Sequence, residues 1–120
     1  MENSTTKIDN IIDQLTNHNY TNILKNIKKL ISKNQDQSPQ NMFIIEMINS
    51  LCYYNLHKYK KSEDSIRQAL KTLSSVDLAF WSRYQFLITM ILATTQHDDL
   101  LIRCLDRVHE LPDKVGKLRS

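Results

Sequence analysis

The sequence has very few of the residues that interrupt helices or build phosphate-binding loops. It contains one glycine, Gly116, and two prolines, Pro39 and Pro112, among 120 residues. Sheet proteins need glycine in tight turns, and dinucleotide or P-loop sites need a glycine-rich loop. Residues 1–115 have no glycine, which excludes both classes. The hydrophobic content of 41% is enough for a core, so we expect one small all-α domain.

Cysteine and histidine are also scarce, and their spacing indicates neither a catalytic site nor a metal site. Cys52 and Cys104 are far apart on apolar stripes, so we expect reduced, buried thiols. A catalytic thiol would need an activating partner, and none is nearby in the sequence. No His-Glu-x-x-His pattern occurs among the four histidines, His18, His57, His97 and His109. We expect the first three at exposed bends of the chain. We therefore predict no enzyme, no metal site and no cofactor.

Charge and long apolar runs are limited as well. The net charge is only +3, and the longest apolar stretch, residues 86–93, is far shorter than the roughly 20 residues of a membrane span. The polar residues 1–6 lack the core of a signal peptide. These features predict a soluble protein of the cytoplasm or nucleus that does not contact a membrane.

Lysines gather in two places. One group lies on the predicted second helix and the other near the second bend: Lys25, Lys28, Lys29 and Lys33, then Lys58, Lys60 and Lys61. We interpret both groups as solvated faces, with an acidic partner protein as the main alternative. Nucleic acid is a weaker alternative, because binding it favours exposed aromatics and arginines among the lysines, and here the tyrosines fall on core stripes.

Apolar residues recur at helical spacing through most of the chain. Their pattern predicts six helices in three antiparallel hairpins, at about 5–33, 38–74 and 77–111. We expect Ser38, with Pro39 after it, and Asp77 to cap two of the helices. The bends fall at His18, His57 and His97, which are 39 and 40 residues apart. Such a period predicts a right-handed α-solenoid domain over residues 1–112, with 113–120 as a polar tail or the start of a further repeat.

The second hairpin resembles a tetratricopeptide (TPR) repeat. This motif places small residues where two helices cross closely and large residues in the gaps between them. The matching packing positions are Ser50, Tyr53, Tyr59, Ser62, Ile66 and Ala69. Glu46 departs from the tryptophan-like position, and Ser74 stands where the motif ends in proline.

A longer resemblance covers most of the chain. The run from Asn19-Tyr20 to Ile31, the segment Ser38-Pro39-Gln40, the region 46–73 and the end, 93–120, are similar to the N-terminal region of the subunit-seven family of the anaphase-promoting complex. That family implies homodimerising TPR repeats in a ubiquitin-ligase scaffold of the cell cycle, without catalysis. The chain differs in having about three hairpins and no long insertion after the second.

The predicted third and fifth helices have more apolar side chains than three hairpins should bury. We expect the aromatic residues mostly in the core, Tyr84 and Phe86 included, but a surplus to form a partner surface. This surface comprises Met42, Phe43, Met47, Tyr54 and Phe80. The sequence thus predicts a non-catalytic protein-interaction scaffold and homodimer. The alternatives are a TPR-like adaptor for a different protein and, less favoured, a basic helical adaptor for nucleic acid.

Overall fold

The computed structural model describes residues 4–33 and 38–107, and this part of the chain is helical with no strand. The α-helices are α1 (Ser4–Gln14), α2 (Tyr20–Lys33), α3 (Pro39–Asn55), α4 (Tyr59–Leu70) and α5 (Leu78–Thr94). Short 3-10 helices follow α1 and α4, at Leu15–Asn17 and Leu73–Ser75. A further helix covers residues 98–107. The all-α prediction is confirmed, whereas the predicted end of the third hairpin and the tail at 113–120 lie outside the described residues.

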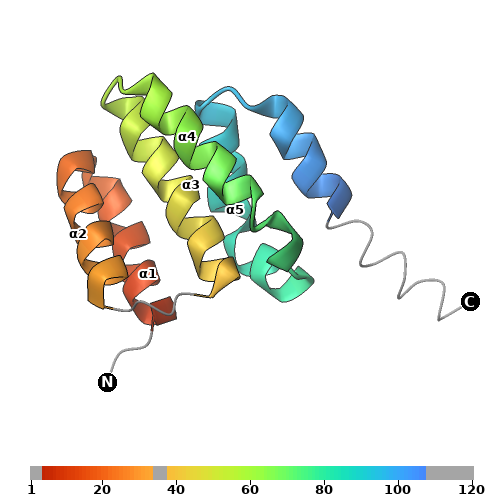
Figure 1. Cartoon of the computed structure of the whole chain (residues 1–120), viewed down its shortest axis with the longest axis horizontal. Coiled ribbons are helices and arrows are strands. Elements are labelled where there is room, and N and C mark those ends of the chain that lie inside the picture. Colours follow the sequence, from red (N-terminus) through yellow and green to blue (C-terminus); the bar gives the residue numbers. More distant parts are fainter. Residues whose placement is uncertain (1–3, 34–37, 108–120) are drawn as a thin grey trace, which may run out of the picture.

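Helix α3 lies at the centre of the molecule. It contacts α1, α2, α4 and α5, and its longest interface is with α4 (Figure 1). Helices α1 and α2 lie on one side of the α3–α4 pair, and the helix at 98–107 lies at the opposite edge of the view (Figure 1). Consecutive helices from α1 to α4 are therefore neighbours in space, and α5 packs against α3.

Two of the long helices begin at the residues that the sequence predicts as caps. The Ser38 hydroxyl accepts a hydrogen bond from the Asn41 backbone N–H at 3.2 Å, and Pro39 opens α3. The Asp77 carboxylate accepts from the Phe80 N–H at 2.8 Å and starts α5. This backbone hydrogen bond holds the pKa of Asp77 below its usual value, and Gln40 adds a second one. Both caps satisfy N–H groups that have no partner within their helix.

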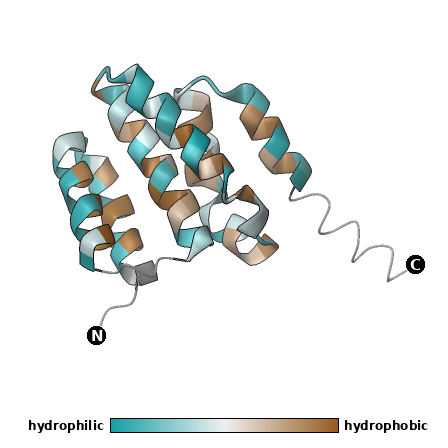
Figure 2. Ribbon diagram, viewed as in Figure 1, coloured by the Kyte–Doolittle hydropathy of each residue, from teal (hydrophilic) through white to brown (hydrophobic). Residues whose placement is uncertain are grey.

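The core is built around α3. Ile44 and Cys52 of this helix are fully buried, as are Ile8 of α1 and Ile23 of α2 on one side and Ile88 of α5 on the other. Figure 2 shows the front of α4 largely hydrophilic, while more hydrophobic residues lie on α3 and α5 behind it. The hydrophobic residues of α3 thus meet apolar partners from all of its neighbours.

The two cysteines are buried free thiols, as predicted. Burial raises the pKa of Cys52 to about 12 and that of Cys104 to about 11. The thiolate is the reactive form of cysteine, and it is scarce at neutral pH when the pKa is this high. Both side chains therefore act as small apolar groups in the core.

Candidate interaction surface

The bends of the chain repeat with a constant spacing. His18, His57 and Gln96 adopt left-handed backbone conformations, with φ of 56°, 63° and 61°, and successive members are 39 residues apart. In the first two bends the histidine Nδ1 lies 2.9 Å from the hydroxyl of a tyrosine two residues later, Tyr20 or Tyr59. The contact corresponds to a His-x-Tyr pattern that the sequence repeats at both bends. The spacing of the histidines alone did not reveal it.

The third bend corrects the predicted role of His97. The left-handed position belongs to Gln96, one residue earlier, and His97 is half-buried rather than exposed. Its Nδ1 lies 2.8 Å from the Thr95 hydroxyl, and its Nε2 lies 2.6 Å from a carboxylate oxygen of Glu63 on α4. His97 therefore links the third bend to the second hairpin, a contact between residues far apart in the sequence.

Helices α3 and α4 cross closely at two serines. Ser50 and Ser62 are both buried, and the Ser62 hydroxyl donates a hydrogen bond to the Ser50 carbonyl at 2.8 Å. Farther along α4, Ile66 and Ala69 are also buried. A larger side chain at either serine would push the two backbones apart.

The aromatic residues of this hairpin lie at its edges. Tyr53 is half-buried, with the Lys61 ammonium 5.7 Å from its ring centroid. Tyr59 is 51% exposed and packs edge to face against Tyr54, with ring centroids 5.2 Å apart. The two tyrosines at predicted packing positions therefore keep one side open to solvent.

The structure corrects most of the predicted partner surface. Phe43, Met47 and Phe80 lie in the core, and Phe43 packs edge to face against Phe80 with ring centroids 6.5 Å apart. Met42 and Tyr54 are half-buried. The prediction assumed that three hairpins leave one side of the third helix open, but α3 has a neighbouring helix on each of its sides. The surplus apolar side chains of α3 therefore fill the spaces between helices.

A different apolar surface is exposed, on α5. Phe86, which was predicted to lie in the core, is 84% exposed, and Met90, one helical turn later, is 42% exposed. We call this pair the α5 stripe. A signal for it was present in the sequence, because Ser82 and Thr89 share a helical face with Phe86. Polar residues at that spacing mark the solvent side of α5, and both of these are exposed.

Hollows flank the α5 stripe, one where α1 approaches α5 and the other between the first bend, α3 and α5. One has a volume of about 320 Å³ and includes Ile12, Phe86 and Leu87 in its lining. The other has a volume of about 260 Å³, and Leu15, Leu51 and Met90 contribute apolar surface to it. The stripe is therefore a raised apolar ridge between depressions that are themselves partly apolar.

Polar contacts hold α1 against α5 beside the stripe. Arg83 forms a salt bridge with Asp9, and the Tyr84 hydroxyl donates a hydrogen bond to the same carboxylate at 3.1 Å. Burial raises the pKa of Tyr84, and the negative charge of Asp9 adds to this effect. The hydroxyl thus stays protonated and able to donate. These contacts hold α1 against α5, and their residues Asp9, Arg83 and Tyr84 themselves line the first hollow.

The described residues contain no group of three or more histidines, cysteines and carboxylates that could hold a metal ion. Nor does any helix in this part of the chain have the length and apolarity needed to cross a membrane. Comparison with known protein families, with curated proteins and with solved structures found no match to this chain. The functional interpretation therefore depends on the geometry of the chain itself.

Proposed function

We propose that the chain is a non-catalytic protein–protein interaction module whose helical hairpins stack as a right-handed, TPR-like solenoid. The left-handed bends that recur every 39 residues support a repeating hairpin unit. The close crossing at Ser50 and Ser62 supports TPR-like packing within the second unit. In a solenoid of this kind each hairpin contacts its neighbours, and the exposed faces are free to bind other proteins.

The exposure of Phe86 is the observation that carries this proposal. The Phe86 side chain is 84% exposed, so the isolated chain does not gain the free energy of burying this large aromatic ring. Covering a phenylalanine side chain contributes about 1.5–3 kcal/mol. Aromatic and methionine side chains are also enriched at protein interfaces relative to the rest of a protein surface. The α5 stripe is therefore the surface at which we expect a partner to bind.

The partner we favour is a second copy of the chain. A symmetric dimer uses the same surface on both copies, so a ridge must lie beside a hollow that accepts its equivalent. The α5 stripe has this form, because hollows with apolar walls at Ile12 and Leu15 lie next to Phe86 and Met90. The dimer would bury both stripes at once.

The resemblance to the subunit-seven family extends the proposal to a particular assembly. It implies a TPR-type subunit of the anaphase-promoting complex that works in the nucleus or cytoplasm, with no catalytic role of its own. The supporting residues are those of the second hairpin, from Glu46 to Leu73, together with the Ser38-Pro39 helix start. Self-association of the α5 stripe fits a scaffold in which repeats of two copies meet.

The test is the mass in solution, measured by size-exclusion chromatography with light scattering across a dilution series. We expect twice the chain mass of 14.1 kDa, falling to that mass for Phe86→Glu. Gln68→Glu adds the same charge at an exposed site on α4 and should leave the dimer intact. A wild-type chain of 14.1 kDa at every concentration would overturn the homodimer and favour an adaptor for a different protein.

A further inference from the structure

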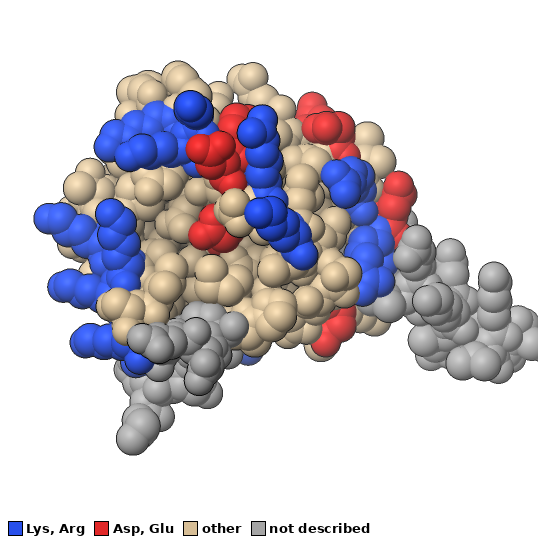
Figure 3. Space-filling view, in the orientation of Figure 1, with Lys and Arg blue, Asp and Glu red and all other residues tan. Residues whose placement is uncertain are grey.

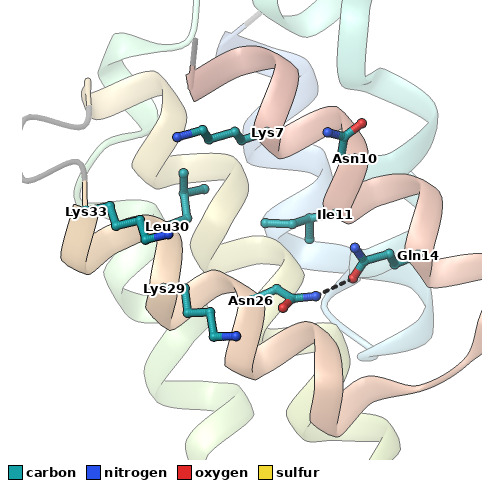
Figure 4. Close-up of a pocket in the computed structure, with 8 residues that line it drawn as sticks. All are labelled: Lys7, Asn10, Ile11, Gln14, Asn26, Lys29, Leu30 and Lys33. Carbon is teal, nitrogen blue, oxygen red and sulfur yellow. Dashed lines mark hydrogen bonds between the residues drawn. The ribbon is translucent and has the colours of Figure 1, made fainter. Parts of the chain in front are cut away.

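A groove between α1 and α2 carries three lysines and lies away from the α5 stripe. Its volume is about 200 Å³. Lys7 extends over it from α1, and Lys29 and Lys33 border it from α2 (Figure 4). Ile11 and Leu30, both only 5% exposed, contribute its apolar floor.

Neutral amides complete the lining of the groove. Asn10 and Gln14 come from α1 and Asn26 from α2. The Asn26 side chain donates a hydrogen bond to the Gln14 side-chain oxygen at 2.7 Å, which joins the two helices at one end (Figure 4). Gln14 and Asn26 each keep further donor or acceptor capacity, because an amide side chain has both.

The positive charge of the groove is not balanced within the described part of the chain. Helix α2 carries four lysines and no acidic residue, and no salt bridge between described residues involves Lys7, Lys29 or Lys33. The nearest acid of α1 in sequence to Lys7, Asp9, pairs instead with Arg83 of α5. Figure 3 shows basic side chains gathered at the edge formed by α2, with the acidic ones elsewhere on this face. An anionic ligand would offset the mutual repulsion of these lysines.

The position of Lys7 adds to this imbalance. It lies in the first turn of α1, which begins at Ser4. The N-terminal end of a helix carries partial positive charge, so a lysine there is unfavourable for the helix itself. The helix dipole therefore does not favour a lysine at this position, whereas a bound anion would offset its charge.

We propose that this groove binds an extended acidic segment of a partner protein. This inference depends on the proposed interaction function and specifies the chemistry of a second partner. The lysines would pair with glutamate or aspartate side chains, the amides would hydrogen-bond the peptide backbone, and Ile11 and Leu30 would contact its apolar atoms. Opposite charges across such a surface mainly set specificity and the rate of encounter.

The lining favours an acidic peptide over nucleic acid. Single-stranded nucleic acid binds by stacking bases on aromatic side chains, with arginine as a frequent helper. Among the residues that the structure describes, neither aromatic residues nor arginines line this groove. Its apolar floor suits the aliphatic atoms of a peptide instead.

The experiment measures binding of a fluorescent glutamate-rich peptide to the full chain by anisotropy at low salt. We expect Lys7→Gln/Lys29→Gln/Lys33→Gln to weaken binding by about tenfold or more, which corresponds to about 1.4 kcal/mol. The matched control is Lys25→Gln/Lys28→Gln/Lys58→Gln, which removes three exposed lysines that do not line the groove. It should weaken binding by less than about threefold, because exposed charges act over a distance and are screened.

Besides a failure of the wild-type chain to bind the peptide, three outcomes would overturn the proposal. Equal losses in the two triple variants would mean that only net charge matters. Equal binding of a peptide with glutamine in place of glutamate would remove the role of the carboxylates. Tighter binding of an oligonucleotide of equal charge, lost in the groove variant, would assign the groove to nucleic acid.

The same variants separate this inference from the proposed dimer. Phe86→Glu should keep peptide binding while losing the dimer, and the groove variant should keep the dimer while losing the peptide. A monomeric wild type that still binds the peptide would overturn the dimer alone. A dimer that ignores the peptide would overturn the groove alone.

Discussion

Helices α3 and α5 look alike in the sequence and have different surroundings in the structure. Each has 17 residues and a single charged side chain, Glu46 in α3 and Arg83 in α5. Both are apolar on nearly every side. Yet α3 is enclosed by four helices, while α5 leaves Phe86 84% exposed. Apolar content thus indicates how much surface needs cover, and the order of the hairpins decides which side receives it.

The two charged residues show the same difference. Glu46 is half-buried on α3, and burial raises its pKa although a hydrogen bond from Asn49 opposes this effect. Arg83 is exposed on α5, and its hydrogen bond with Asp9 raises its pKa and so favours the charged form. Burial in the enclosed helix α3 therefore disfavours the charged form of Glu46. In the more open helix α5, charged Arg83 is stabilised by Asp9 and helps to hold α1 in place.

The largest expected effect comes from truncating one phenylalanine on each helix. Phe43→Ala removes a ring that is 1% exposed and should cost about 3–5 kcal/mol, as buried phenylalanines do. Phe86→Ala removes an exposed ring and should change the stability of the monomer by less than about 0.5 kcal/mol. The measurement is urea unfolding at concentrations where the chain is monomeric.

Repeating the unfolding at high protein concentration sharpens this contrast. If the α5 stripe is covered in a dimer, the cost of Phe86→Ala should grow with concentration, because association stabilises the folded state. The cost of Phe43→Ala should not change with concentration. Similar costs for the two variants in the monomer would contradict the difference in cover between α3 and α5.

A smaller loss of stability should follow from disturbing the packing of α4 against α3. Ser62→Val adds volume where α4 crosses α3, next to the Ser50 carbonyl, and should cost about 1–3 kcal/mol through overpacking and the lost hydrogen bond. Ser62→Ala loses only the hydroxyl and serves as the control. If valine costs no more than alanine, the crossing is looser than the 2.8 Å contact indicates. Unfolding in urea measures both.

Much of the fold could be predicted because local signals agree with one another. Ser38 followed by Pro39 marks the start of α3 in the sequence, and Asp77 marks the start of α5. The stripe from Tyr20 to Ile31 falls within α2, and its members Ile23 and Ile27 are buried. These features depend on neighbours within a few residues, which a single sequence displays directly.

The candidate surface could not be predicted in the same way, because it depends on contacts between distant segments. Phe43 is buried because Phe80 of α5 packs against it, and nothing near Phe43 in the sequence says so. The walls beside Phe86 come from α1, held by the contact between Asp9 and Arg83. The lysine groove could be predicted only in part. Its α2 residues follow from helical spacing in the sequence, whereas Lys7 joins them only through the packing of α1 on α2.

The smallest predicted effect concerns the single charge of α3. Glu46 has a raised pKa in the folded chain, so the folded state holds its proton more tightly than the unfolded state. Its contribution to stability is therefore present below the unfolded value and is lost as the pH rises through the folded value. Glu46→Gln should raise the melting temperature near pH 7 and leave it nearly unchanged at about pH 4, where the carboxyl is mostly protonated.

The surroundings of Glu46 limit how much stability the Glu46→Gln substitution can add. A glutamine oxygen can still accept the hydrogen bond from Asn49, now 3.2 Å from the carboxylate, so the variant removes the charge and keeps the contact. Lys61 and Asp64, of opposite charge, line the same hollow as Glu46, and the Glu46 side chain is only half-buried, so we expect a gain below about 1 kcal/mol. Asp106→Asn, at an exposed position in the helix at 98–107, is a control for the loss of one negative charge. A variant less stable than wild type at neutral pH would mean that attraction of Glu46 to the surrounding positive charge outweighs the cost of its burial, and that even the enclosed helix gains from its charge.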